Sequence, residues 1–464
     1  MASIVENGKT FQVVDVKIGS VASRASSSIF VIICILPMIT TLLYGGVDAV
    51  VLGLQSLAAA AVMILWIRDA WITEGFRFST NPLQLPIIGL ILIGFVQLLP
   101  IGDHGVATGL LNVPVASSIS LDPFGTRMFT VRLIVYLIFF AAALAFVDSK
   151  TRFIRLATLA VIFGSLTGFF GLLQRLANPD AIYGLRPTPQ AIPFGPFINQ
   201  HHFAAFMLMT FALSLGMLLS SGVTRDRKAF LLLACVVSAM GLFFTGSRGG
   251  VLSFAGVLFF TIAAAYMMRA PKASTEPARN PALKLSMIAG VIAIVIIVIG
   301  SVFYLGGGDS LLRGIGGGQN YVDVSNGRIH FWKTSIEIIK NHPLLGAGLD
   351  SFGVTFTRFD TQNGLFRVEN AHNEYLQVLA EGGIAGFLCL AAFIYFLLRR
   401  GLTNISQTSD SLMQGIATGA LAGCIGIAIH SFFDFPLRTP SNALFFLVLA
   451  VLATIPFKTN TSRG

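Results

Sequence analysis

The chain has 464 residues, of which 55% are hydrophobic and 11% are charged, with a formal net charge of +10 at pH 7. Soluble globular domains carry about a quarter of charged residues, so this composition excludes that class and indicates a polytopic membrane protein. The basic residues follow loops between apolar segments, and no basic run with interleaved aromatic residues appears, so we expect no nucleic-acid partner.

Apolar runs of about 17 to 22 residues recur along the chain, each long enough to cross roughly 30 Å of hydrocarbon as a helix. They predict an all-α polytopic membrane protein embedded in a lipid bilayer. The 27 residues before the first run are largely polar and no cleavage pattern follows it, so we expect a span and not a signal peptide. About 12 spans are predicted, at residues 28–44, 47–67, 83–100, 130–147, 153–174, 202–221, 229–245, 250–268, 284–305, 384–398, 413–432 and 441–457.

Lysine and arginine indicate how these spans are oriented, because they are enriched in short cytoplasmic loops. They gather in the loops 148–155 and 224–228 and at Arg399–Arg400. We therefore expect both termini in the cytoplasm and a long, partly helical loop on the outer side, between spans 9 and 10. The predicted parts are a cytoplasmic tail (1–27), nine spans (28–305), the large outer loop (306–383), and three spans with a short cytoplasmic tail (384–464).

The outer loop that leads into the sixth span contains several prolines, which exclude a regular helix before residue 197. Arg186, Asn199 and His201 lie in it, close to the predicted outer membrane boundary. Two interpretations stay open for these residues, an interfacial cap on the sixth span and contact with a substrate.

A lone arginine, Arg248, occupies the short outer turn Thr245–Gly250 between the seventh and eighth spans. The turn offers backbone N–H groups, a helix N-terminus and a guanidinium together, a combination that suits a phosphate or diphosphate. The alternative is an arginine that extends to the lipid headgroups. Three glycines in the turn allow close approach to its backbone, which favours the binding role.

Two helices are predicted in the large outer loop. The first begins near Arg328, where apolar residues recur at helical spacing, and ends at Asn341–Pro343. Arg328 at a helix start is unfavourable for the helix dipole and would gain from an anionic partner. Asn370 is predicted to cap a second helix over residues 371–381, which Gly382–Gly383 would stop.

His372, at the start of that second helix, is the predicted catalytic residue. A neutral imidazole with a pKa near its usual value of about 6.5 can remove a proton from an attacking hydroxyl group. A histidine that only caps a helix is the alternative, and the arginines Arg248 and Arg328 on the same outer face favour catalysis. Further along the chain, Asp434 and Arg438 are either an ion pair with each other or members of the site.

No cofactor is predicted. The chain has no Asp-x-Asp or His-Glu-x-x-His motif that would supply ligands to a metal ion. The four cysteines all lie in apolar runs, where they behave as small hydrophobic residues and not as disulfide or zinc ligands. Negative charge on a leaving group would then be met by arginines, in a transfer that needs no metal.

Three motifs resemble the bacterial O-antigen ligase and O-antigen polymerase family of integral membrane glycan transferases. They are the Thr-Gly-Ser-Arg-Gly turn at Arg248, the Gly-Arg-x-x-x-Trp helix start at Arg328, and the His-Asn-x-x-Leu segment at His372 in the long outer loop. The resemblance implies that His372 activates the acceptor and that Arg248 and Arg328 bind a diphosphate. Asp434 resembles an acidic position near the end of the family's pattern.

The same resemblance implies a fold related to polytopic glycosyltransferases with lipid-linked donors, in the bacterial inner membrane. Such enzymes act on the periplasmic face and take a glycan from undecaprenyl diphosphate. The acceptor is a lipid A–core sugar in ligases, a growing polysaccharide chain in polymerases and a protein hydroxyl in a related branch. The sequence leaves the branch open.

Two other functions remain as alternatives. A transporter or flippase for a lipid-linked sugar usually places ionisable residues in mid-membrane, whereas here the polar residues collect on one face. A non-catalytic component of a polysaccharide assembly complex predicts that the two arginines and the histidine tolerate substitution. The sequence favours a transferase over both.

Overall fold

The computed structural model describes residues 3–6, 9–15, 23–101, 118–177, 180–189, 191–268, 328–362 and 368–456. Helices dominate these residues, and eight of the described helices are long and apolar enough to cross a membrane. This confirms the prediction of an all-α polytopic membrane protein. The predicted span at 284–305 and the start of the large outer loop lie outside the described residues.

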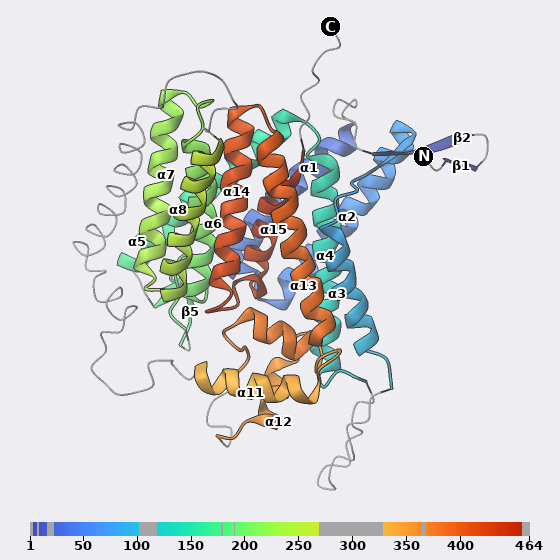
Figure 1. Cartoon of the computed structure of the whole chain (residues 1–464), viewed down its shortest axis with the longest axis vertical. Helices are drawn as coiled ribbons and strands as arrows, with labels where there is room; N and C mark the ends of the chain where they lie inside the picture. The colour runs from blue at the N-terminus through green and yellow to red at the C-terminus, as the bar shows by residue number, and fades with distance from the viewer. Residues whose placement is uncertain are drawn as a thin grey trace.

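Helices occupy each predicted span that falls on described residues (Figure 1). The first eight are α1 (Arg24–Leu42), α2 (Ala49–Thr73), α3 (Gln84–Gln97), α4 (Pro123–Phe146), α5 (Lys150–Ala177), α6 (Gln200–Leu218), α7 (Arg225–Phe244) and α8 (Arg248–Met268). The last three are α13 (Glu374–Gln407), α14 (Ser411–His430) and α15 (Pro440–Thr454). Two short 3-10 helices, η1 (Tyr44–Gly46) and η2 (Pro436–Arg438), precede α2 and α15.

Short strands, which the sequence analysis did not predict, complete the described structure. β1 (Ser3–Glu6) pairs antiparallel with β2 (Lys9–Asp15), and β2 pairs parallel with β3 (Gly75–Phe78) after α2. β4 (Ala181–Ile182) and β5 (Arg186–Pro187) form a small antiparallel pair in the loop before α6.

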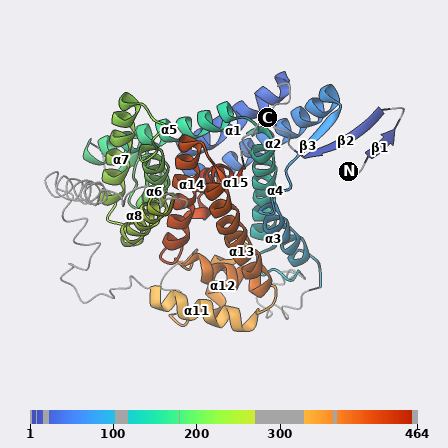
Figure 2. The same cartoon turned by 45° about the horizontal axis from the view of Figure 1, so that its top comes forward.

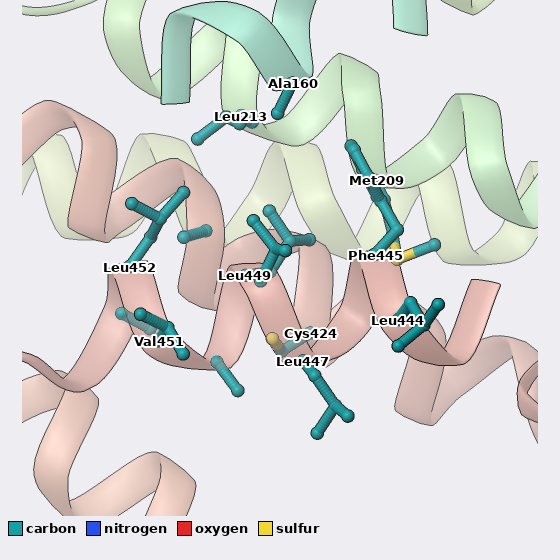
Figure 3. Packing of buried hydrophobic residues seen from close by; sticks show 14 of the residues in the cluster. Ala160, Met209, Leu213, Cys424, Leu444, Phe445, Leu447, Leu449, Val451 and Leu452 are labelled. Atoms are coloured by element: carbon teal, nitrogen blue, oxygen red, sulfur yellow. The ribbon is translucent and has the colours of Figure 1, made fainter. Parts of the chain in front are cut away.

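The core of the bundle is built around α6, whose residues from Phe203 to Met217 are all buried. It packs against α7, α14 and α15. Glycines on α14 make the closest approach: a Cβ on Gly419 would lie 2.5 Å from the carbonyl oxygen of Ala212. Figure 3 shows how Met209, Leu213 and side chains of α14 and α15 fill the remaining space, with Cys424 among them.

The two ends of the bundle differ. The start of α1 and the end of α15 lie at the same end as the α2–β3 turn, where Ser23 hydrogen-bonds to Asp69 and Asn81 donates to Thr454 Oγ1 over 2.9 Å. At the opposite end, α11 (Arg328–Asn341) and α12 (Phe352–Phe359) lie outside the bundle (Figure 1). The bounds of α11 match the predicted helix of the large loop.

The second predicted helix of the large loop is wrong at its start. The helix begins at Glu374, not at residue 371, because the Oδ1 atom of Asn373 accepts the N–H groups of Tyr375 and Leu376, both at 3.1 Å. Asn370, the predicted cap, instead accepts a hydrogen bond from Gln377. At the other end, the predicted stop is confirmed, because Gly383 has a non-helical backbone (φ 61°, ψ −161°) and α13 is two helical segments joined across this kink. The N–H groups of Ile384 and Ala385 donate to the carbonyls of Pro343 and Leu344, so the kink separates the outer segment from the tenth predicted span.

Candidate functional site

His372 lies immediately before the Asn373 cap, with a left-handed backbone at φ 49°. A non-glycine residue in this region costs energy and needs surrounding contacts to hold it. The neighbouring Ala371 supplies them: its N–H donates to Gln377 Oε1 at 3.0 Å, and its carbonyl accepts the indole N–H of Trp332 at 3.1 Å. Helix α11 and helix α13 thus fix the backbone on which His372 sits.

The imidazole of His372 is paired with a carboxylate from the α14–α15 connection. His372 Nδ1 and Asp434 Oδ1 lie 3.2 Å apart, and the side chains are 30% and 3% exposed. The histidine is therefore the accessible member and Asp434 the buried one. With Nδ1 donating to Asp434, Nε2 is the nitrogen that can accept a proton. Aromatic rings flank the imidazole: Phe331 stacks on it at 6.0 Å and Phe435 meets it edge-on at 5.0 Å.

Asp434 is held in its ionised form. Burial alone would raise its pKa, but the hydrogen bond with His372 and the field of His201 and His202 outweigh burial and lower the pKa below its ordinary value. The backbone N–H of Phe435 also donates to Asp434 Oδ1 at 3.0 Å. A carboxylate that stays charged orients the imidazole and stabilises its protonated form.

The two predicted arginines begin two helices at this end of the bundle. Arg248 is the first residue of α8 and is exposed, and Arg328 is the first residue of α11. Burial lowers the pKa of Arg328, nearby Arg248 lowers it further, and Asp434 opposes both. Two cations within electrostatic reach of each other repel, and an anion between them would relieve that repulsion. The structure therefore brings His372, Asp434, Arg328 and Arg248 into one electrostatic neighbourhood, with His201 within reach of the first three.

Two further histidines lie near Asp434, the half-buried His202 and the buried His430. His202 Nδ1 lies 2.7 Å from Thr439 Oγ1, and its ring contacts Phe435 at 5.0 Å. His430 is 1% exposed, and neither of its ring nitrogens has a hydrogen-bond partner among the described residues. His430 lies against the turn of Arg248, since a Cβ on Gly249 would meet His430 Cδ2 at 3.0 Å.

Because of this close contact, a substitution at Gly249 tests whether the activity depends on the exact position of the Arg248 turn. A methyl group there would also lie 2.8 Å from Phe433 Cβ, so Gly249→Ala must displace the start of α8. A shift of this kind is expected to lower transfer activity by about 10²-fold, because a misplacement near 1 Å is enough for such a loss. Gly53→Ala in α2, where nothing lies within 4 Å of the added atom, is the matched control and should retain activity. Equal activity of both variants would contradict a positioned Arg248 turn.

Two of the predicted substrate contacts have local structural partners. Arg186 forms a two-bonded ion pair with Asp48 at 2.7 and 3.1 Å and covers the ring of Tyr44. Asn199 caps α6 by accepting the N–H of His201 at 2.8 Å. Neither contact involves His372 or Asp434, and the interfacial-cap interpretation fits Asn199 well.

Arg438 has partners that the sequence analysis did not anticipate. It does not pair with Asp434, which is bound to His372; it donates to Glu374 Oε1 at 3.1 Å. It also donates to Asp350 Oδ1 at 3.2 Å and to Glu381 Oε2 at 2.6 Å. The planar guanidinium presents donors in several directions, so one arginine can join three carboxylates from two segments.

Residues 233–391 match the family model described as O-antigen ligase. The match covers about a third of the chain, from α7 through the Arg248 turn and α11 into α13. This part of the chain is similar to the O-antigen ligase family. The predicted resemblance to the O-antigen ligase and polymerase family is thereby confirmed. Among curated proteins, no match is found.

The matched part of the chain contains Arg248, Arg328 and His372, whereas Asp434 and Arg438 follow it in the chain. Sequence analysis missed the acidic residues on α13 within this part. Their signal is visible in hindsight, because Glu374, Gln377 and Glu381 recur at helical spacing and are all buried. His202 comes near Asp434 through the packing of α6, whereas His430 precedes Asp434 by four residues, and its carbonyl accepts the N–H of Asp434 at 3.1 Å.

Proposed function

We propose that the protein transfers a glycan from undecaprenyl diphosphate to an acceptor hydroxyl on the periplasmic face of the bacterial inner membrane. The match to the O-antigen ligase family supports glycan transfer in general. The donor, the inverting course, the independence from metal ions and the cytoplasmic position of both termini are parts of the proposal. The observation that carries it is the pairing of half-buried His372 with buried, ionised Asp434 beside Arg328.

In the proposed reaction, the acceptor oxygen attacks the anomeric carbon while its proton moves to His372 Nε2. The bond between that carbon and the diphosphate oxygen breaks, and its electron pair leaves with undecaprenyl diphosphate. Direct attack inverts the anomeric carbon. Asp434 stabilises the imidazolium that forms, as an oriented carboxylate does for a catalytic histidine.

Arg248 and Arg328 would meet the negative charge that grows on the diphosphate. The helix N-termini from which both arginines extend add partial positive charge at the same place. Fixed cations at a leaving group lower the barrier without reorganisation during the reaction.

Arg328→Met is the variant that tests the diphosphate role. It is expected to lower donor turnover by about 10²- to 10³-fold, the usual loss when one charge-stabilising donor is removed. Purified protein in nanodiscs, supplied with undecaprenyl-diphosphate-linked glycan and acceptor, gives the rate as released undecaprenyl diphosphate. Arg358→Met, an exposed arginine on α12 in the same outer segment, is the matched control and should behave as wild type. Equal loss in both variants, or in neither, would exclude a specific diphosphate contact.

A further inference from the structure

A second polar cluster lies on the opposite side of the site from the two arginines. Helices α8 and α4 lie on opposite sides of α14 and α15 in both Figure 1 and Figure 2. One face of α4 carries Phe129, Arg132 and Tyr136 at positions i, i+3 and i+7, which align on a helix. The guanidinium of Arg438 lies over Phe129, 5.0 Å from the ring centre. This face of α4 therefore lies against Arg438, which donates hydrogen bonds to Glu374, Asp350 and Glu381.

Three polar atoms in this cluster have no hydrogen-bond partner among the residues that the structure describes. They are Arg132 Nε, Tyr136 OH and Glu374 Oε2. Tyr136 is 7% exposed and Glu374 is 8% exposed, so protein surrounds both side chains. An unsatisfied polar atom in such a place is destabilising, and a ligand hydroxyl would provide the missing hydrogen bond. Two donors and one acceptor match hydroxyl groups, which both donate and accept.

Asp350 is the most exposed residue of the cluster. The Asp350 side chain is 40% exposed, and its carboxylate lies within electrostatic reach of Arg132 and Tyr136. Seven residues separate Phe129 from Tyr136, which corresponds to a depth of about 10 Å along α4. The cluster thus extends from an exposed carboxylate at Asp350 to the buried hydroxyl of Tyr136.

The net charge of the cluster favours some classes of ligand over others. Arg132 and Arg438 carry two positive charges against three negative charges on Glu374, Glu381 and Asp350, a net charge of −1. This balance disfavours a second diphosphate and suits a neutral polyhydroxyl group. Carboxylates, an arginine and aromatic rings together provide acceptors, donors and an apolar face for such a ligand.

The position of the cluster relative to His372 indicates which of the two substrates it binds. Glu374 follows His372 by two residues, and its carboxylate is within electrostatic reach of both Asp434 and Asp350. The proposed diphosphate contacts Arg248 and Arg328 begin α8 and α11, whereas this cluster lines α4. In an inverting displacement the nucleophile arrives from the side opposite the leaving group.

We propose that Arg132, Tyr136 and Glu374 bind the sugar of the acceptor glycan and present its hydroxyl to His372. This inference rests on the proposed transferase function and names the subsite for its second substrate. The hydroxyl of Tyr136 has no hydrogen-bond partner among the described residues. We therefore expect this hydroxyl to contribute to ligand binding and not to the stability of the fold.

The test is a kinetic comparison in nanodiscs, with lipid A–core and undecaprenyl-diphosphate-linked repeat units each offered as acceptor. Tyr136→Phe is expected to raise the KM for the acceptor about 3- to 10-fold, and Arg132→Met about 10- to 100-fold, with the donor KM unchanged. Tyr136→Phe should keep the wild-type melting temperature. Matched controls are Arg127→Met, an exposed arginine on α4, and Tyr395→Phe, an exposed tyrosine on α13.

A binding measurement separates this inference from the proposed function. Binding of labelled acceptor to His372→Ala protein, with and without Tyr136→Phe, reports the subsite when transfer itself is blocked. Weaker binding after Tyr136→Phe supports the subsite. Unchanged acceptor binding and KM, or equal changes in the KM of donor and acceptor, would overturn it. Wild-type protein that transfers to neither acceptor contradicts the proposed function, whereas the binding result still decides the subsite.

Discussion

Cells that carry His372→Ala as their sole copy of the protein are expected to lose the surface glycan that it assembles. Alanine removes the only group proposed to accept the acceptor proton, and general base catalysis contributes about 10²- to 10⁴-fold. The measurement is the amount of surface glycan on gels, set against the amount of membrane-inserted protein. The lipid-linked donor should accumulate in the same cells.

His342→Ala is the matched control for this variant. His342 lies in the same outer segment and contacts Phe359, with ring centres 6.4 Å apart, away from the Asp434 pair. It should leave surface glycan at the wild-type level. Normal glycan in cells that express well-inserted His372→Ala would contradict a catalytic role for the imidazole and would favour a non-catalytic assembly component.

Arg438→Met is expected to have the second large effect, on folding more than on chemistry. Burial lowers the pKa of Arg438, but Glu381, Glu374 and Asp350 raise it above the ordinary value, so the guanidinium is charged at every relevant pH. Its removal leaves buried carboxylates without a counter-charge, which costs about 3 to 5 kcal/mol for one broken buried pair. Thermal unfolding of the detergent-purified variant should show a clear fall in melting temperature, and the His372 segment should lose order with it.

A second substitution checks the cause of this loss. Arg438→Met combined with Glu381→Gln removes one of the carboxylates left unpaired, so part of the stability should return through coupling between the two sites. Arg400→Met, at an exposed position on α13, the helix that carries Glu381, controls for loss of an arginine in general. If the double variant is no more stable than Arg438→Met, the charge cluster does not explain the instability.

Helix positions were the most predictable part of this fold. The apolar length needed to cross a membrane is a local property of the chain, and α1 to α8 coincide with their predicted spans. The start of α11 at Arg328 was equally readable, because apolar residues recur there at helical spacing. The stop at Gly383 was predicted as well, but the start of α13 was missed, because Asn373 and not Asn370 caps the helix.

Pairing between distant segments was not predictable from the sequence. His372 and Asp434 are 62 residues apart, and nothing local indicates that Asp434 binds the histidine and leaves Arg438 to the acidic residues of α13 and the Asp350 turn. The role of Arg132 and Tyr136 on α4 was not predictable for a related reason. Two polar residues in an apolar run resemble interfacial residues until packing shows that they face other polar groups.

Transfer by the purified protein is the measurement that decides most directly whether His372 drives glycan transfer. Wild type and His372→Ala, each in nanodiscs with EDTA, receive undecaprenyl-diphosphate-linked glycan and candidate acceptors, and product and anomeric configuration are recorded. We expect wild type alone to form product, with the configuration inverted. Equal product from both proteins, or no product with lipid-linked sugar crossing a liposome membrane instead, would contradict the proposed transferase.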